Sequence, residues 1–160
     1  MEFYQNPSLK VGSLAVQVDD SELRARFERS LNRFISIARS FFKERLDAIA
    51  VFGSMVDPSK KLKPDSDIDL VVFHRASEEE VVLFHRLLPT ERRRRVKEVV
   101  EEWSWYYDEP LKHDVENDVY WHVFYVETPR MPRVLRRLGV YKLVYVNPSS
   151  SPNLVVRVKA

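Results

Sequence analysis

Two short apolar runs constrain the fold of this chain more than any other feature of its sequence. The first, residues 48–52, is uninterrupted and predicts a central strand that is buried on both faces. The second, residues 68–73, is rich in valine and predicts another strand. Two acids, Asp67 and Asp69, lie at the start of this second strand. Because burying an ionised carboxylate without a partner is unfavourable, these acids require a cation or a specific chemistry nearby.

The alternation of side chains along a strand predicts that the two aspartates share a face. Asp67 and Asp69 then project to one side, while Ile68 and Leu70 point to the other and pack in a core. Neighbouring carboxylates repel each other, and a bound cation relieves that repulsion. Their oxygens suit a hard ion such as Mg²⁺, and a second ion would make a two-metal site for phosphoryl-type displacement. A structural alternative, in which Ser66 and Asp67 merely begin the strand, leaves Asp69 unexplained.

The first strand ends in Gly53 and Ser54, a pair suited to binding anions. Glycine lets the backbone approach a ligand closely, while the serine hydroxyl and nearby backbone N–H groups can hold phosphate oxygens. One strand end therefore offers an anion site and the neighbouring strand offers a cation site. A nucleoside triphosphate with Mg²⁺ satisfies both.

The segment "FGSMVDPSKKLKPDSDIDLVV" resembles the signature of the nucleotidyltransferase superfamily that includes DNA polymerase beta, the CCA-adding enzymes and the minimal nucleotidyltransferases. In that signature a strand ends in Gly-Ser or Gly-Gly, and Asp-x-Asp follows in the next strand after a variable stretch. Gly53-Ser54 matches the first part, and Asp67-Ile68-Asp69 matches the second. The resemblance covers residues 48–73 and implies a polymerase beta-like fold of the minimal type.

The resemblance also implies an activity. A nucleoside monophosphate would move from a triphosphate, with ATP as the expected donor, to an acceptor hydroxyl of a protein or RNA, and pyrophosphate would be released. Asp67 and Asp69 would hold two Mg²⁺ ions, and Mn²⁺ could replace them. Gly53 and Ser54 would hold the β- and γ-phosphates. Minimal nucleotidyltransferases often work beside a HEPN-type partner in toxin–antitoxin pairs, and some relatives have lost catalysis. A catalytically weak, antitoxin-like nucleotide-binding module is therefore the alternative.

The superfamily normally carries a third carboxylate on a later strand, which residues 118–126 are expected to supply. Asp118 and His122 share a face of that strand by alternation. Asp118 is the expected third catalytic and metal-binding residue because it is a carboxylate. His122 is a possible substitute ligand or base, and it also fits a histidine that simply packs or hydrogen bonds within the sheet.

A second departure follows Ser54, where many relatives carry an arginine that this chain lacks. Lys60, Lys61 and Lys63 are candidates to replace its charge, with Lys60 and Lys63 the expected nucleotide-binding residues. Alternatively, these lysines belong to a solvated loop and serve solubility alone.

The rest of the chain alternates predicted helices and strands. Apolar residues at steps of three and four predict an amphipathic helix over residues 23–45, with its arginines in solvent. Further helices are predicted from the cap Ser77 to Pro89, over residues 90–107, and from Pro132 to Gly139. Strands are expected over residues 11–18, 141–146 and 154–158, and a loop over 108–117. The class is α/β or α+β, a mixed sheet flanked by helices in a single domain over residues 1–160.

Composition and charge add weaker expectations. The chain has no cysteine, which excludes disulfides and thiolate chemistry, and without a signal-like or membrane-spanning segment we expect a cytoplasmic protein. The net charge of +2 is too small to indicate nucleic-acid binding, although the run at residues 92–95 leaves open a nucleic-acid-binding protein with a vestigial site. The segments "LAVQV" and "LVVRV" make a homodimer by strand pairing a further possibility.

Overall fold

A five-stranded mixed sheet forms the centre of the molecule. The computed structural model describes residues 14–89 and 111–149, and the order of the strands across the sheet is β3-β4-β2-β1-β5. Neighbouring strands run antiparallel except β2 and β4, which are parallel. The strands are β1 (Leu46–Phe52), β2 (Asp67–His74), β3 (Leu111–Asp114), β4 (Val119–Glu127) and β5 (Tyr141–Val146). The predicted class, a mixed sheet flanked by helices, is confirmed.

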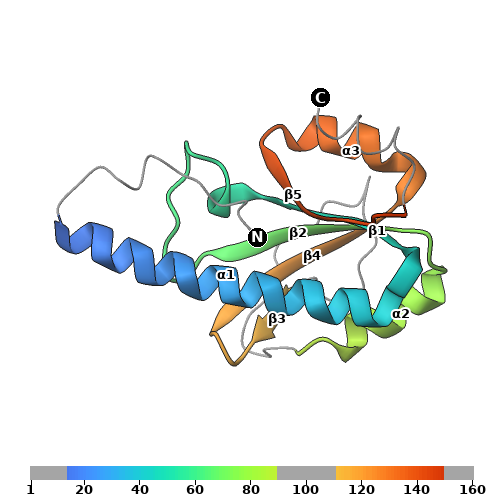
Figure 1. Cartoon of the computed structure of the whole chain (residues 1–160), viewed down its shortest axis with the longest axis horizontal. Helices are drawn as coiled ribbons and strands as arrows, with labels where there is room; N and C mark the ends of the chain where they lie inside the picture. Colours follow the sequence, from blue (N-terminus) through green and yellow to red (C-terminus); the bar gives the residue numbers. More distant parts are fainter. Residues whose placement is uncertain (1–13, 90–110, 150–160) are drawn as a thin grey trace.

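In the described part of the chain, three α-helices cover the two faces of this sheet. The helices α1 (Leu14–Phe42) and α2 (Glu78–Leu87) pack on one face, and α3 (Met131–Leu138) packs on the other (Figure 1). Short 3₁₀ turns occur at η2 (Lys43–Arg45), η3 (Gly53–Met55) and η4 (Thr128–Arg130). None of the described helices has both the length and the apolar character needed to cross a membrane.

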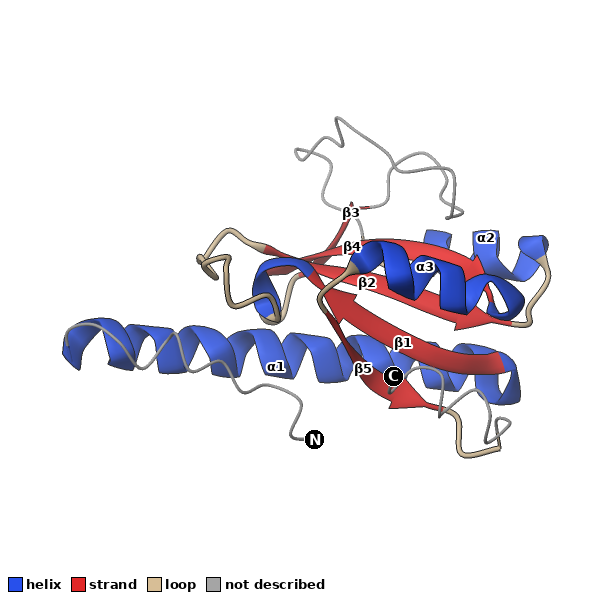
Figure 2. Cartoon of the chain, turned by 90° about the horizontal axis from the view of Figure 1, so that it is seen from above, coloured by secondary structure: helices blue, strands red, loops and turns tan. Residues whose placement is uncertain are grey.

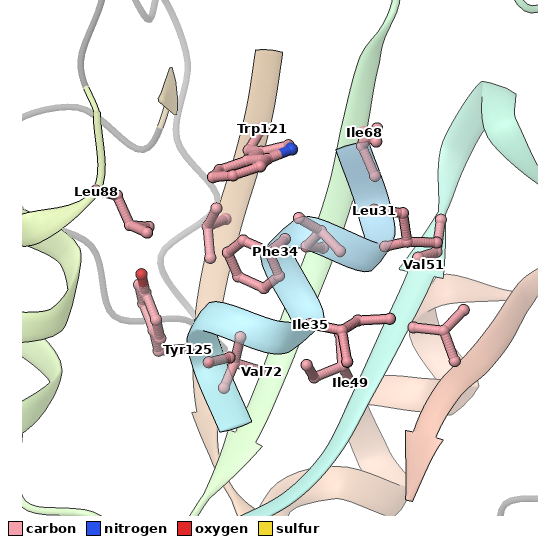
Figure 3. Close-up of a cluster of buried hydrophobic side chains, with 14 of the residues drawn as sticks. Leu31, Phe34, Ile35, Ile49, Val51, Ile68, Val72, Leu88, Trp121 and Tyr125 are labelled. Carbon is pink, nitrogen blue, oxygen red and sulfur yellow. The ribbon is translucent and has the colours of Figure 1, made fainter. Parts of the chain in front are cut away.

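The larger core lies between α1, α2 and the sheet, and it is rich in aromatic side chains. The predicted apolar stripe of α1 is confirmed, because its central members are fully buried against the sheet: Phe27, Leu31, Phe34 and Ala38. Phe34 meets Trp121 of β4 edge to face, with ring centroids 5.1 Å apart (Figure 3). The Trp121 indole N–H donates to the buried Ser30 hydroxyl at 2.8 Å. Aromatic packing and one buried hydrogen bond therefore hold α1 against β4.

The arginines of α1 do more than face solvent, and that prediction is wrong for Arg26 and Arg33, which are partly buried. Arg26 donates to the Pro64 carbonyl at 2.8 Å, in the loop that leads into β2. Arg33 pairs with the fully buried carboxylate of Asp114 at 2.8 Å, at the end of β3. Similarly, Arg29 donates to the Asn117 side chain in the turn before β4. The helix thus fixes the chain where β2 and β4 begin.

Two other predictions are wrong, and both errors reflect tertiary context. The segment "LAVQV" lies in α1 and not in a strand, since extending a formed helix needs no new nucleation and outweighs the weak strand preference of valine. The predicted loop at 108–117 contains β3, an edge strand stabilised by antiparallel pairing with β4. The predictions at residues 90–107, including Arg92–Arg95 as a basic run, and at "LVVRV" lie outside the described residues.

His74, at the end of β2, is a buried histidine whose environment favours the neutral ring. Its side chain is almost completely buried and stacks on Phe42, and burial lowers its pKa below the ordinary value. The Ala76 backbone N–H donates to Nδ1 at 3.0 Å, which also requires an unprotonated nitrogen there. The nearby Glu127 carboxylate opposes the shift without reversing it.

We therefore expect the protein to lose stability in mild acid. A lowered folded pKa means that the contribution of His74 is fully present above its unfolded pKa of about 6.5 and is lost as pH falls below that value. The slope from this residue reaches at most about 1.4 kcal/mol per pH unit. Urea unfolding at about pH 7.5, 6.5 and 5.5 measures it. In His74→Asn, which keeps an acceptor for Ala76 but does not titrate, the pH dependence should be shallower; an unchanged slope would contradict this assignment.

Candidate functional site

The end of β1 is a tight turn built around Gly53. This residue has a φ of +80°, in the left-handed region that favours glycine, and it follows Phe52 in extended conformation. Its carbonyl accepts hydrogen bonds from the N–H groups of Val56 and Asp57 at 3.1 and 2.9 Å. Met55 is fully buried and anchors the turn, whereas Ser54 stays partly exposed. The turn therefore presents a fixed glycine backbone and a serine hydroxyl at the edge of the sheet.

Asp69 lies directly against this turn. It pairs with Phe52 across the β1–β2 ladder, and a Cβ atom built on Gly53 would lie 2.1 Å from its Oδ2 atom. Asp67 lies two residues earlier on the same strand and is also partly exposed. The intervening Ile68 is fully buried on the α1 side, as alternation requires. The structure thus brings together the Gly-Ser and Asp-x-Asp motifs that the sequence separates.

His122 is the neighbour of Asp69 on the other side. The two residues pair in the parallel β2–β4 ladder, and His122 Nδ1 lies 3.3 Å from Asp69 Oδ1. His122 Nε2 is buried and has no hydrogen-bond partner among the residues that the structure describes. Asp69 is therefore held between a glycine backbone and a histidine, and in the described ranges it has no lysine or arginine partner. His122 therefore contacts the motif itself, an arrangement that fits both a substitute ligand and a histidine that hydrogen bonds within the sheet.

The pairing of the strands places four side chains in a row on the α3 face of the sheet. From β5 to β4 the row reads Tyr141, Phe52, Asp69 and His122. The aromatic members pack into the smaller core under α3, and they place an apolar surface beside the acid pair. Phe52 and Tyr141 were missed in the sequence because only the strand pairing shows that they adjoin Asp69.

Asp118 is not brought together with the two motif aspartates. It lies in the turn before β4 with a φ of +54°, so strand alternation does not yet apply to it. Its exposed carboxylate contacts His113 Nε2 at 2.9 Å, and the His113 ring stacks on Tyr120 with centroids 4.3 Å apart. Over residues 14–89 and 111–149 no group of three acidic or histidine side chains is placed to hold a metal ion. The role of Asp118 as a third metal ligand stays a prediction.

The loop between Ser54 and Asp67 has an ordered backbone and exposed lysines. Hydrogen bonds from the Ser59 N–H and hydroxyl cap the Asp57 carboxylate and lower its pKa. Leu62 is buried and anchors the middle of the loop. The side chains of Lys60, Lys61 and Lys63 lie in solvent and form no ion pair with any described residue. They supply positive charge to this loop without being bound to a carboxylate.

The donor set fits a hard divalent cation. Two carboxylates that share a face, one of them packed against the Gly53 backbone, provide oxygen ligands. The partly exposed positions of both aspartates leave them accessible to a ligand. Such a site can hold a metal-bound polyphosphate and orient it against the sheet edge.

A family model described as "Nucleotidyltransferase domain" matches residues 31–134, which is more than half of the chain. The matched range includes β1, the turn at Gly53, both motif aspartates and His122. No curated protein matches the chain, and neither does any solved structure.

Proposed function

We propose, because this chain belongs to the nucleotidyltransferase domain family, that it transfers a nucleoside monophosphate from a nucleoside triphosphate to an acceptor hydroxyl. The observation that carries the proposal is the contact between the two motifs. The Gly53 backbone lies so close to Asp69 Oδ2 that only glycine fits. An anion held by the turn and a cation held by the aspartates would therefore share one site, as a metal–triphosphate complex requires.

Each residue has a role in this proposal. Asp67 and Asp69 would hold Mg²⁺, with Mn²⁺ as a substitute, and Gly53 and Ser54 would bind the β- and γ-phosphates. When bound, the metal offsets the negative charge on the reacting phosphate oxygens. The acceptor hydroxyl would bond to the α-phosphorus and lose its proton to water, while the bond from that phosphorus to the bridging oxygen breaks and pyrophosphate leaves. The residues would act chiefly by positioning and charge neutralisation. Lys60 and Lys63 would add positive charge near the triphosphate.

His122 would act on Asp69 and not on the acceptor. Its Nδ1 atom faces Asp69 Oδ1, which orients the carboxylate, while its Nε2 atom is buried and closed to a substrate. A general base must lie within hydrogen-bond reach of the proton it removes, and a buried nitrogen does not meet that condition. We therefore favour a positioning role for His122 over the role of a base.

The test is the Mg²⁺-dependent binding and transfer of labelled ATP. Calorimetry with ATP should show binding that requires Mg²⁺, and Asp69→Asn should weaken it at least about tenfold because one metal-binding charge is lost. Circular dichroism and thermal unfolding should show a folded variant, since Asp69 is partly exposed. Glu79→Gln on α2, an exposed acid on the opposite side of the sheet, is the matched control. If Asp69→Asn binds Mg–ATP like the parent, the site is misassigned.

A second function is favoured by the position of His122, which pairs with Asp69 on the later strand where the superfamily normally carries a carboxylate. A nucleotide-binding module with weak catalysis, antitoxin-like and paired with a HEPN-type protein, would keep the binding turn and tolerate His122 in place of a carboxylate. Binding of Mg–ATP without label transfer to protein or RNA acceptors would support this module. Label transfer would support the enzyme.

A further inference from the structure

The outer face of α3 carries a cluster of arginines. Between Thr128 and Gly139 the chain contains four arginines and no acidic residue. Their spacing of three and four places them on one side of the helical segment, opposite the buried Met131, Val134 and Leu135. We call this surface the α3 arginine face, and its members are Arg130, Arg133, Arg136 and Arg137.

Two exposed arginines of this face differ from the paired arginines Arg33 and Arg45 on the other side of the sheet. On the other side of the sheet Arg33 pairs with Asp114, and Arg45 pairs with Glu80. Arg133 and Arg136 are exposed and form no ion pair with any residue in the ranges described. The helix dipole favours cations in the last turn, which accounts for Arg136 but not for Arg133 in the first half of the helix. Two exposed guanidinium groups one helical turn apart, Arg133 and Arg136, are suited to the phosphates of a polyanion.

The α3 arginine face lies on the same side of the sheet as the candidate site. Asp69, Val71 and Phe73 alternate along β2 on one face, and α3 packs over the last two of them. The helix begins after the C-terminal end of β4 and runs back along the sheet (Figure 2). After Gly139 the chain enters β5, where Tyr141 pairs with Phe52, the residue before Gly53. The C-terminal end of α3 therefore reaches the end of the sheet that carries the aspartates.

We propose that the α3 arginine face binds the phosphate backbone of a single-stranded nucleic acid whose sugar hydroxyl is the acceptor. This inference rests on the proposed nucleotidyl transfer and names its acceptor class. The strand would lie along α3 toward Tyr141 and Phe52, so that its terminal hydroxyl enters beside Asp69. The guanidinium group of an arginine can donate two hydrogen bonds to the oxygens of one phosphate, and these contacts do not depend on the base sequence. The arginines would therefore position the strand, and Asp67 and Asp69 would serve the reaction.

The experiment measures binding of the strand without nucleotide or metal. Fluorescence anisotropy would use a labelled RNA of about 20 nucleotides, and a DNA of the same sequence, in EDTA from about 50 to 200 mM salt. In the double variant Arg133→Glu/Arg136→Glu, affinity at low salt should fall at least about tenfold. The slope of log affinity against log salt should become shallower by roughly 1.4, since each lost phosphate contact on a single strand contributes about 0.7.

The control is a double variant with the same change of charge on the opposite side of the sheet. Arg39→Glu/Arg86→Glu alters exposed arginines of α1 and α2, and its affinity should stay within about twofold of the parent. If Arg133→Glu/Arg136→Glu fails to fold, Arg133→Gln/Arg136→Gln removes the charge without reversing it. Stronger binding of RNA than of DNA would identify the 2′-hydroxyl as part of recognition, and equal binding would assign it to phosphate alone; both support the surface.

Two results overturn the inference. One is the failure of the parent protein to bind either strand, which would favour an acidic protein as the acceptor. The other is an equal loss of affinity in both double variants, which would reflect total charge and not this face. Mg–ATP binding, measured separately on the same variants, distinguishes the two proposals. Intact ATP binding with no strand binding refutes only the surface, whereas strand binding by a parent protein that does not bind ATP refutes only the proposed transfer.

Discussion

Replacing Gly53 with alanine is expected to weaken Mg–ATP binding by about 100-fold or more, because it displaces the carboxylate that would hold the metal. The added Cβ would lie 2.1 Å from Asp69 Oδ2 and 3.1 Å from its carboxyl carbon. No real Cβ tolerates the first distance, so Asp69 must rotate away or β2 must move from the turn. Either change separates the anion and cation sites. Calorimetry with ATP and Mg²⁺ measures the loss.

Gly139→Ala is the matched control for this variant. Gly139 also has a positive φ, +76°, but a Cβ there would meet nothing within 4 Å. Both variants should lose about 1–2 kcal/mol of stability from the left-handed backbone, which chemical denaturation measures. Only Gly53→Ala should lose nucleotide binding. Equal ATP affinity in the two variants would show that the contact between turn and carboxylate has no functional role.

Replacing Arg33 with methionine is expected to lower the free energy of unfolding by roughly 2–3 kcal/mol. The change leaves the Asp114 carboxylate fully buried with the Asn117 amide, which donates at 2.9 Å, as its remaining described side-chain partner. Removing one member of a fully buried ion pair costs about 3–5 kcal/mol, and the partial exposure of Arg33 reduces that figure. Methionine keeps the aliphatic length of the side chain, so the loss reports the charge. Urea unfolding at neutral pH measures it.

Two further variants define the origin of this loss. Arg45→Met removes a pair with Glu80 in which both side chains are partly exposed, and it should cost less than about 1 kcal/mol. Adding Asp114→Asn to Arg33→Met should recover part of the stability, because a neutral amide is less costly to bury than a carboxylate. Equal losses for Arg33→Met and Arg45→Met would mean that the burial of Asp114 has no energetic consequence.

Much of the fold follows from local patterns in the sequence. The valine-rich run at residues 68–73, with Asp67 before it and Asp69 inside it, became β2 with its partly exposed start. The helix capped by Ser77 has the expected reciprocal hydrogen bonds with Glu80. These elements were predictable because their residues act within one turn or one strand. The strand β3 was not, since its four residues carry no strand pattern and depend on pairing with β4.

The candidate site was predictable where it rests on consecutive strands. Gly53 and Asp69 belong to neighbours joined by one connection, so their motifs predicted a common edge. Asp118 and His122 could not be separated by alternation alone, because a left-handed residue at Asp118 breaks the pattern just before the strand starts. Similarly, the spacing of the α1 arginines could not reveal which of them reach Pro64 or Asp114, since those acceptors are distant in sequence.

The contact between Asp69 and His122 joins positions 53 residues apart along the chain, whereas β1 and β2 are joined by the shorter connection over residues 53–66. Contacts of high sequence separation carry a larger loop-closure entropy and usually slow folding. Gly53 and the two aspartates can therefore come together early in folding. His122 joins them only when β4 pairs with β2. A ligand that needs all four residues stabilises only the completed sheet, so its binding would report the last step of folding.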